Sequence, residues 1–210
     1  MSTAYEQSGR TAQKLRTRAE LIAAARKLIA FGGAPPTVAD AASAASISRT
    51  TAYRYFSNQH DLLAAAHPET ERTTLLPPDI GNDPEERLSA AVTEFVRMIL
   101  ATEAQQRTML RLSLEASTRP GQLPLRQGRG IGWFEDALSP LLAELGAERV
   151  HRLALGVRSA VGIEALVWLT DVAGLSREEA RRLIRWSAQA LLGAALTSPP
   201  PTSRSRRRSP

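Results

Sequence analysis

The side chains that most often carry catalysis or bind metals are sparse and scattered in this sequence. It contains no Cys, which excludes disulfides, thiol catalysis and Cys-ligated metals. The three His residues, His60, His67 and His151, share no metal-ligand spacing with carboxylates. No nucleophile elbow, nucleotide loop or dinucleotide fingerprint is present. We therefore expect no catalytic residue, no metal and no cofactor, and a protein that is not an enzyme.

A different chemistry is carried by a short run that combines hydroxyls, guanidinium groups and phenols. On a helix beginning near Arg49, Ala52 and Phe56 would share one narrow apolar face. The residues that lie on or flank the opposite side are Arg49, Thr50, Tyr53 and Arg54. Such groups bond to phosphate oxygens and to base edges, so this helix is a candidate for DNA contact.

The elements around this run predict how it is positioned. Thr37 and Asp40 have the spacing of a capping box, and apolar residues recur at helical intervals from Val38 to Ala45. That short helix should stop near Ser46, and Ser48 is placed to cap the next one. Two short helices joined by a tight turn, the second cationic on its outer side, indicate a helix-turn-helix whose second helix enters the major groove.

At these residues the chain resembles the N-terminal DNA-binding domain of the TetR family of transcriptional regulators. Ten positions fit that family's pattern: Thr37, Val38, Ala42, Ala45, Ser48, Arg49, Thr51, Tyr53, Tyr55 and Phe56. Four positions depart from it. Ala41 and Ala52 stand where the pattern has Ile and Leu, which leaves fewer apolar atoms in the small core. Ser46 replaces Gly and strains the turn. Gln59 replaces a Lys that would contact phosphate.

The expected DNA-contacting residues follow from this arrangement. Arg49 and Tyr53 are placed to reach base edges, and Arg49 has the geometry to bond a guanine bidentately. Phosphate contacts suit Thr37, Ser48, Thr51 and Tyr55. The outer side of the same helix adds Thr50 and Arg54, and the basic end of the preceding helix adds Lys14 and Arg18.

Composition places the whole chain in the all-α class, because helix formers dominate and β-branched and aromatic residues are sparse. The net charge of +6 is concentrated at the two ends. Residues 1–66 hold eight Lys or Arg and four Asp or Glu, and residues 197–210 hold four Arg and no acid. Basic ends suit a polyanion partner, although charge by itself equally serves solubility. No uninterrupted apolar run of membrane length and no signal peptide were recognised, so we expect a cytoplasmic protein without a membrane partner.

Four segments are expected along the chain. A helix-turn-helix domain spans 13–66, after a frayed polar arm, and 67–82 forms the end of a connecting helix and a linker. A larger helical domain for effector binding and dimerisation spans 83–196. Residues 119–130 form a flexible loop within it, and 197–210 have the composition of a disordered basic tail.

The last two helices of the larger domain, about 147–173 and 176–196, indicate how the protein assembles. The first is apolar on nearly all sides and must be covered on nearly all sides, for which a second subunit is the natural partner. The resemblance implies the same homodimer, whereas a monomer with a central helix is the alternative. Candidates for the two-fold seam are Leu155, Gly156, Val161, Gly162, Leu166, Leu191 and Ala194.

For the larger domain, the resemblance implies a pocket that binds a small apolar or amphipathic effector. Candidate lining residues are Phe95, Met98, Met109, Leu112, Trp133, Phe134 and Trp168, with Glu115 or Glu164 to orient the ligand. Any one of these apolar side chains is more often plain core than ligand contact.

Two functions remain open at this point. The first is a dimeric, effector-responsive transcriptional regulator, most simply a repressor that occupies a palindromic operator. The second is a helical small-molecule binding protein whose helix-turn-helix has lost specific DNA readout. Ala41, Ala52 and Gln59 keep the second hypothesis open.

Overall fold

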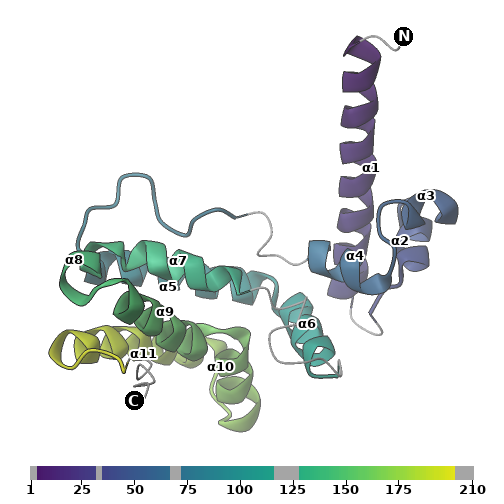
Figure 1. The fold of residues 1–210 in the computed structure, drawn as a ribbon. Coiled ribbons are helices and arrows are strands. Elements are labelled where there is room, and N and C mark those ends of the chain that lie inside the picture. The colour runs from purple at the N-terminus through teal and green to yellow at the C-terminus, as the bar shows by residue number, and fades with distance from the viewer. Residues whose placement is uncertain (1–3, 32–34, 67–71, 116–127, 202–210) are drawn as a thin grey trace, which may run out of the picture. The chain divides into compact units, whose positions relative to one another are not determined.

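A computed structural model describes residues 4–31, 35–66, 72–115 and 128–201. These residues form helices joined by turns and irregular segments, with no strand among them (Figure 1). The predicted all-α class is therefore confirmed. The remaining residues include most of the predicted 119–130 loop and of the basic tail, which lie outside the described part of the chain.

The chain divides into two compact units, which are described separately below. Unit 1 comprises residues 1–70 and 102–127, and unit 2 comprises residues 71–101 and 128–210. Unit 1 holds α1 (Ala4–Ala30), α2 (Val38–Ala44), α3 (Arg49–Tyr53), α4 (Gln59–Ala66) and α6 (Glu103–Glu115). Unit 2 holds α5 (Pro84–Ala101), α7 (Arg129–Ala137), η2 (Ser139–Leu141), α8 (Leu142–Leu145), α9 (Ala147–Val161), α10 (Ile163–Val167), the π-helical turn η3 (Trp168–Val172) and α11 (Arg177–Thr197).

The first helix is longer than the sequence predicted. The frayed arm expected before residue 13 is wrong from Ala4 onward, because α1 begins there and runs without a break to Ala30. This stretch has no apolar period, but it contains no Pro and is rich in residues of good helix propensity. The single glycine in it, Gly9, costs about 1 kcal/mol relative to Ala, which a helix of this length tolerates.

The core of unit 1 joins the helix-turn-helix to α1, α4 and α6. Leu21 and Ala25 of α1, Ala52 of α3 and Leu62 of α4 are fully buried in one cluster. The carbonyl oxygen of Ala66, at the end of α4, accepts two side-chain hydrogen bonds. Arg26 Nε donates from α1 over 3.0 Å, and Gln105 Nε2 donates from α6 over 2.5 Å. The C-terminus of α4 is therefore held by two other helices.

Helix α6 differs from the sequence-based boundaries, which place it in the larger second domain. Met109 of α6 is 1% exposed within the core of unit 1, and Leu112 packs against the same core. The apolar side of α6 thus packs against α1 in the core of unit 1. Sequence periodicity gives this apolar side but not the helix that it covers.

Unit 2 is organised around α9, which packs against both α7 and α11 (Figure 1). The long helix predicted for 147–173 is interrupted at Gly162, whose extended backbone ends α9 and precedes α10. A side chain at Gly162 would collide with Arg158 and Glu164, so a glycine leaves room for their ion pair of 3.4 Å. A second interruption precedes α9, because η2 with Pro140 separates α7 from α8.

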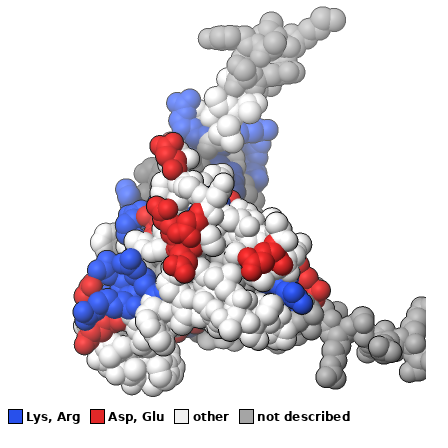
Figure 2. Space-filling model, turned by 90° about the vertical axis from the view of Figure 1, so that its left-hand side faces the viewer, with Lys and Arg blue, Asp and Glu red and all other residues white. Residues whose placement is uncertain are grey.

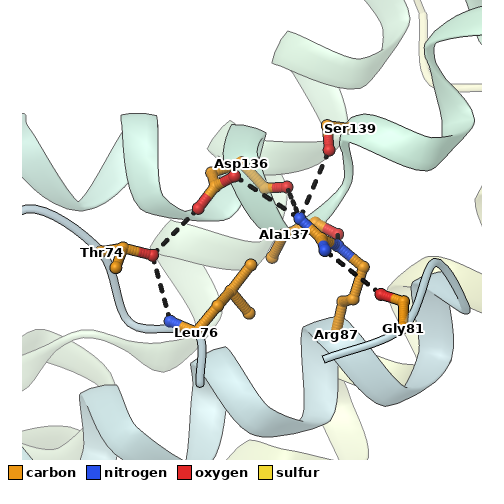
Figure 3. A network of polar contacts seen from close by, with 7 residues as sticks. All are labelled: Thr74, Leu76, Gly81, Arg87, Asp136, Ala137 and Ser139. Carbon is orange, nitrogen blue, oxygen red and sulfur yellow. Dashed lines mark hydrogen bonds and ion pairs between the residues drawn. The ribbon is translucent and has the colours of Figure 1, made fainter. Parts of the chain in front are cut away.

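Residues 72–82, which we call the strap, precede α5 as an irregular segment of unit 2. Thr74 Oγ1 donates to Asp136 Oδ2 of α7 over 3.0 Å and accepts from the backbone N–H of Leu76 over 3.1 Å. Near the other end, the Arg87 guanidinium bridges the strap to the end of α7 (Figure 3). It donates to the carbonyl oxygens of Gly81, Asp136 and Ala137. The strap is therefore fixed to the helices of unit 2 by specific polar contacts.

One stretch of unit 2, Ala147–Val172, is long and apolar enough by length and composition to cross a membrane, although charged residues such as Arg158 and Glu164 interrupt it. The signal is weak, since core helices of soluble proteins satisfy the same criterion. Here the stretch is broken at Gly162, carries the Arg158–Glu164 ion pair and packs against α7 and α11. We treat it as the central helix pair of unit 2.

Candidate nucleic-acid interface

The first helix of the helix-turn-helix begins at a complete capping box. Thr37 Oγ1 accepts from the Asp40 backbone N–H over 3.1 Å and donates to Asp40 Oδ2 over 2.7 Å. The Thr37 backbone N–H donates to the same carboxylate over 2.8 Å. These bonds, led by that from the Thr37 hydroxyl, hold the pKa of Asp40 below its ordinary value. The Thr37 hydroxyl proton is therefore engaged in capping, although the residue is exposed.

The turn between α2 and α3 contains a strained residue. Ser46 has φ of 56°, and it is the single non-glycine residue with positive φ in the described part of the chain. A Cβ in this left-handed region crowds the following carbonyl, at a cost of roughly 1–2 kcal/mol. The backbone N–H of Ile47 donates to Ala42 O over 2.9 Å across the turn. The structure thus shows at Ser46 the strain that the sequence predicts.

The second helix, α3, presents its polar residues outward on a small buried anchor. Ser48 caps it, accepting from the Thr51 backbone N–H over 3.2 Å and donating to Thr51 Oγ1 over 2.8 Å. Ala52 is fully buried, whereas Arg49 and Thr50 are exposed and Tyr53 is 49% exposed. Because the Ser48 proton is used within the cap, Thr51 retains its own hydroxyl proton for an outside acceptor.

The other expected contact residues differ in how far they are available. Arg54 is exposed at the end of α3, whereas Tyr55 is partly buried against the core of unit 1. Lys14 is exposed on α1, where Figure 2 shows basic side chains projecting into solvent. Arg18 is also exposed, but its guanidinium lies over the Phe56 ring, 5.3 Å from the centroid. Arg18 therefore stabilises the domain as well as adding positive charge.

Gln59 has a structural role that the sequence did not reveal. Its Nε2 donates to the carbonyl oxygens of Pro35 and Pro36, over 2.8 Å and 3.2 Å. The side chain therefore ties the start of α4 to the segment just before α2. Sequence comparison with the family pattern identifies only the missing Lys, because the position of residues 35–36 beside α4 is a tertiary property.

The expected effector-lining residues are distributed between the two units. Phe95, Trp133 and Phe134 come together in unit 2, where Phe95 contacts both other rings edge-on at centroid distances of 6.1 and 5.4 Å. Met98 is 6% exposed in the same unit, whereas Trp168 is 58% exposed on η3. Met109 and Leu112 instead belong to the core of unit 1. The side chain of Glu115 lies outside the described part of the structure.

The expected seam residues also divide into two groups. Ala194 is exposed, and Leu155, Gly156 and Leu191 are partly exposed. A Cβ added to Gly156 would meet no atom within 4 Å, so this face of α9 is open to a close neighbour. By contrast, the residues buried within the unit are Val161, Gly162 and Leu166, so their proposed seam position is wrong.

Comparisons with known proteins agree with the helix-turn-helix geometry. The sequence model of the family described as "Bacterial regulatory proteins, tetR family" matches residues 21–66. Among solved structures, a TetR transcriptional regulator from Rhodococcus sp. RHA1 superposes with a TM-score of 0.60 and 18% sequence identity. The match covers 86% of this chain and 98% of that one, and at this identity it shows the shared fold. No curated protein matches the chain.

Proposed function

Because this chain belongs to the TetR family of bacterial regulatory proteins, which makes it a DNA-binding transcriptional regulator, we propose that it is a ligand-responsive repressor. It binds a palindromic operator as a homodimer and works in the cytoplasm. The observation that carries the proposal is α3, where a buried Ala52 anchors an outer face of Arg49, Thr50 and Tyr53. A helix of this kind delivers its first residues to base edges in the major groove.

The proposed contacts divide into those that read sequence and those that fix position. Arg49 and Tyr53 contact base edges, whereas the hydroxyls of Thr51 and Tyr55 and the cations Lys14 and Arg54 contact phosphates. Thr37 and Ser48 act mainly as helix caps, since their protons are already bonded within the protein. They orient the two helices, because each hydroxyl oxygen also accepts a backbone N–H of the helix that it caps.

The proposed dimer uses the outward faces of α9 and α11. Along α11, the exposed positions Leu183, Trp186, Ala190, Gly193 and Ala194 recur at helical spacing. Two large apolar side chains followed by three small residues allow one helix to pack closely against its symmetry mate. One helix-turn-helix domain, called a head below, reads few base pairs. The second subunit of the dimer therefore supplies the contact with the second half-site.

The proposed effector response passes from unit 2 to α4 through α5 and α6. Helix α5 ends at Ala101 and α6 begins at Glu103, so one residue joins them. Gln105 of α6 is bonded to the last carbonyl of α4. A ligand can favour one conformation of unit 2. It lowers operator affinity only if, in that conformation, the distance between the two helix-turn-helix domains no longer matches the distance between the half-sites.

Selection of the full-length protein against random duplexes tests this function. We expect enrichment of a palindrome whose half-sites lie about one helical turn apart. A matched Arg49→Ala, Tyr53→Ala variant, altered only at exposed positions, should enrich no palindrome while keeping its helical content. Weak, sequence-blind binding by the unaltered protein would instead support the small-molecule binding protein without specific DNA readout.

A further inference from the structure

A hollow of about 630 Å³ lies in unit 2 between the strap and the outer face of α5. One wall is formed by strap residues Arg72, Thr74, Leu75, Leu76 and Pro77, and the other by α5 residues Glu86, Ser89, Ala90, Thr93 and Glu94. We call it the strap groove. Its volume falls within the range of small-molecule sites, about 300–1,000 Å³. Its residues are separate from the aromatic cluster that the sequence suggested as the effector pocket.

The walls of the strap groove are held in place before any ligand arrives. Thr74 is bonded to Asp136 of α7, and Leu75 is only 4% exposed, so the strap is anchored beside α5 (Figure 3). On the α5 side, Thr93 Oγ1 donates to the Ser89 carbonyl oxygen over 2.7 Å. A preformed groove costs a ligand little ordering of the protein.

The end of the groove near Arg72 carries an excess positive charge. Arg72 Nη1 lies 2.6 Å from Glu94 Oε1. Glu94 is also bonded by Arg97 through two nitrogens, with Nε to Oε2 and Nη2 to Oε1 both at 2.7 Å. The hydrogen bonds from Arg97 are the main cause that holds the pKa of Glu94 below its ordinary value. Two guanidinium groups therefore share the Glu94 carboxylate, and Arg97 bonds both of its oxygens.

Arg72 is thus the cation that can accept a second anionic partner. Its side chain is 35% exposed, and a guanidinium has five donors of which the Glu94 pair uses few. Beside it, the groove offers the Ser89 hydroxyl and the apolar side chains of Leu76 and Pro77. Glu86 lies eight residues before Glu94, about 12 Å away along α5, and disfavours a second anionic group at that end.

We propose that the strap groove is the effector site, and that it takes an amphipathic monoanion whose carboxylate pairs with Arg72. The apolar body lies along Leu75, Leu76 and Pro77 over Ala90. This inference rests on the proposed function for its regulatory meaning, because the strap is part of the chain between α4 and α5. The binding site itself rests on the groove and its charges.

Binding of two defined monoanions, decanoate and 2-naphthoate, to the full-length protein tests the site by calorimetry. We expect at least one to bind about tenfold or more tightly than decylammonium and decan-1-ol, because a charge-assisted bond to Arg72 distinguishes them. Equal binding of the neutral or cationic compounds would overturn the anion assignment. Absence of binding by both acids would overturn the site.

Four variants separate the groove from other binding modes. Arg72→Gln should weaken acid binding about tenfold or more, and Ala90→Phe should abolish it by filling the floor of the groove. Glu94→Gln should tighten binding severalfold, because Arg72 loses its competing partner. Lys27→Gln, which removes an exposed cation of α1 outside the groove, should bind as the unaltered protein does. Acid binding that resists the first two changes, or that Glu94→Gln weakens, would contradict the proposal.

Operator titration with and without the acid separates this inference from the proposed function. Weaker operator binding in the presence of acid, lost in Arg72→Gln, supports the effector role. Acid binding that leaves operator affinity unchanged overturns that role and keeps the site. A protein that selects no operator yet binds the acid through Arg72 contradicts the proposed function and leaves the site standing.

Discussion

Arg49 is the residue whose chemistry bears most directly on the proposed reading of DNA bases. It is exposed at the first position of α3, near enough to Asp40 to contribute to the lowered pKa of that carboxyl. Thr51 and Ser48 are bonded to one another beside it, so its surroundings are ordered while its own guanidinium faces outward. A planar fork in this position matches the O6 and N7 acceptors of guanine.

We predict that Arg49→Ala weakens binding to the selected operator by about 1–3 kcal/mol and relaxes preference at one base pair. Competition titrations on single-base operator variants measure both effects. Arg49→Lys is the matched control, because Lys keeps the charge but cannot form the bidentate pair. If Lys restores full affinity and preference at every position, Arg49 contacts phosphate rather than a base.

Ser46 lies in the turn between α2 and α3, where a residue with a Cβ strains the backbone and a glycine does not. Its positive φ is imposed by the turn, since Ile47 must bond back to Ala42 and Ser48 must cap α3. Glycine adopts this conformation without a Cβ clash but loses more backbone entropy on folding. The clash, of roughly 1–2 kcal/mol, exceeds the entropy difference of roughly 0.5–1 kcal/mol.

We predict that Ser46→Gly stabilises the protein by about 0.5–1 kcal/mol and raises Tm by about 1–4 °C. Thermal unfolding followed by circular dichroism measures the change. Ser43→Gly is the control, because Ser43 lies within α2 with a helical backbone, where glycine should lower Tm. A decrease in Tm for Ser46→Gly would mean that the serine side chain contributes more than the strain removes.

Helix α2 begins at a capping box whose carboxyl group, that of Asp40, changes its protonation with pH. The lowered pKa of Asp40, caused first by the Thr37 hydroxyl and then by the Thr37 N–H, links the capping box to pH. A carboxyl whose folded pKa lies below its unfolded value stabilises the fold above the unfolded value of 3.8. That stabilisation is lost as the pH falls through the folded pKa.

We predict that Thr37→Val lowers stability at pH 7 by about 1 kcal/mol, since an N-cap bond is lost. The deficit relative to the unaltered protein should shrink as the pH falls below 3.8. Protonation of Asp40 there weakens the bond from the Thr37 hydroxyl to the Asp40 carboxylate in the unaltered protein, and Thr37→Val already lacks that bond. Tm measured from pH 2.5 to 7 tests this, with Thr50→Val, an exposed hydroxyl loss in α3, as the control. A deficit that stays constant with pH would exclude the Asp40 linkage.

In the proposed mechanism, operator binding by the whole protein depends on joining two helix-turn-helix domains. Each unit 1 carries one α3, and in the proposed dimer the outward small residues of α11 allow a second subunit to pack closely. Ala194 is exposed at this face, and a Cβ added to the adjacent Gly193 would meet no atom within 4 Å. A long charged side chain there disturbs no contact within one subunit.

We predict that Ala194→Arg converts the homodimer to a monomer and lowers operator affinity about a hundredfold or more, since the second head is no longer tethered. Sedimentation and DNA titration on the same sample measure both. Ala143→Arg, an equal change at an exposed position of α8, should leave assembly and affinity unchanged. If the Ala194→Arg protein stays dimeric, the dimer interface does not include Ala194. A monomer with full operator affinity would contradict the mechanism in which two helix-turn-helix domains bind together.

Local sequence determined the elements that DNA binding needs. The Thr37–Asp40 and Ser176–Glu179 capping boxes, the Ser48 cap and the strained Ser46 could all be predicted from neighbouring residues. Each involves atoms within a few residues of one another, so spacing along the chain carries the information. The TetR resemblance followed from the same local pattern.

The pairing of elements in the core depends on contacts between segments far apart in the chain, which the fold reveals. The tertiary structure placed α6 on the core of unit 1, buried Val161 and Leu166 within unit 2, and gave Gln59 its bonds to residues 35–36. It also brought Arg72 and Glu94 together across the strap groove. An amphipathic pattern states that a face is buried but not what buries it, because burial of apolar surface is non-directional. The partners are selected by packing between segments far apart in the chain, and that choice is absent from any single segment.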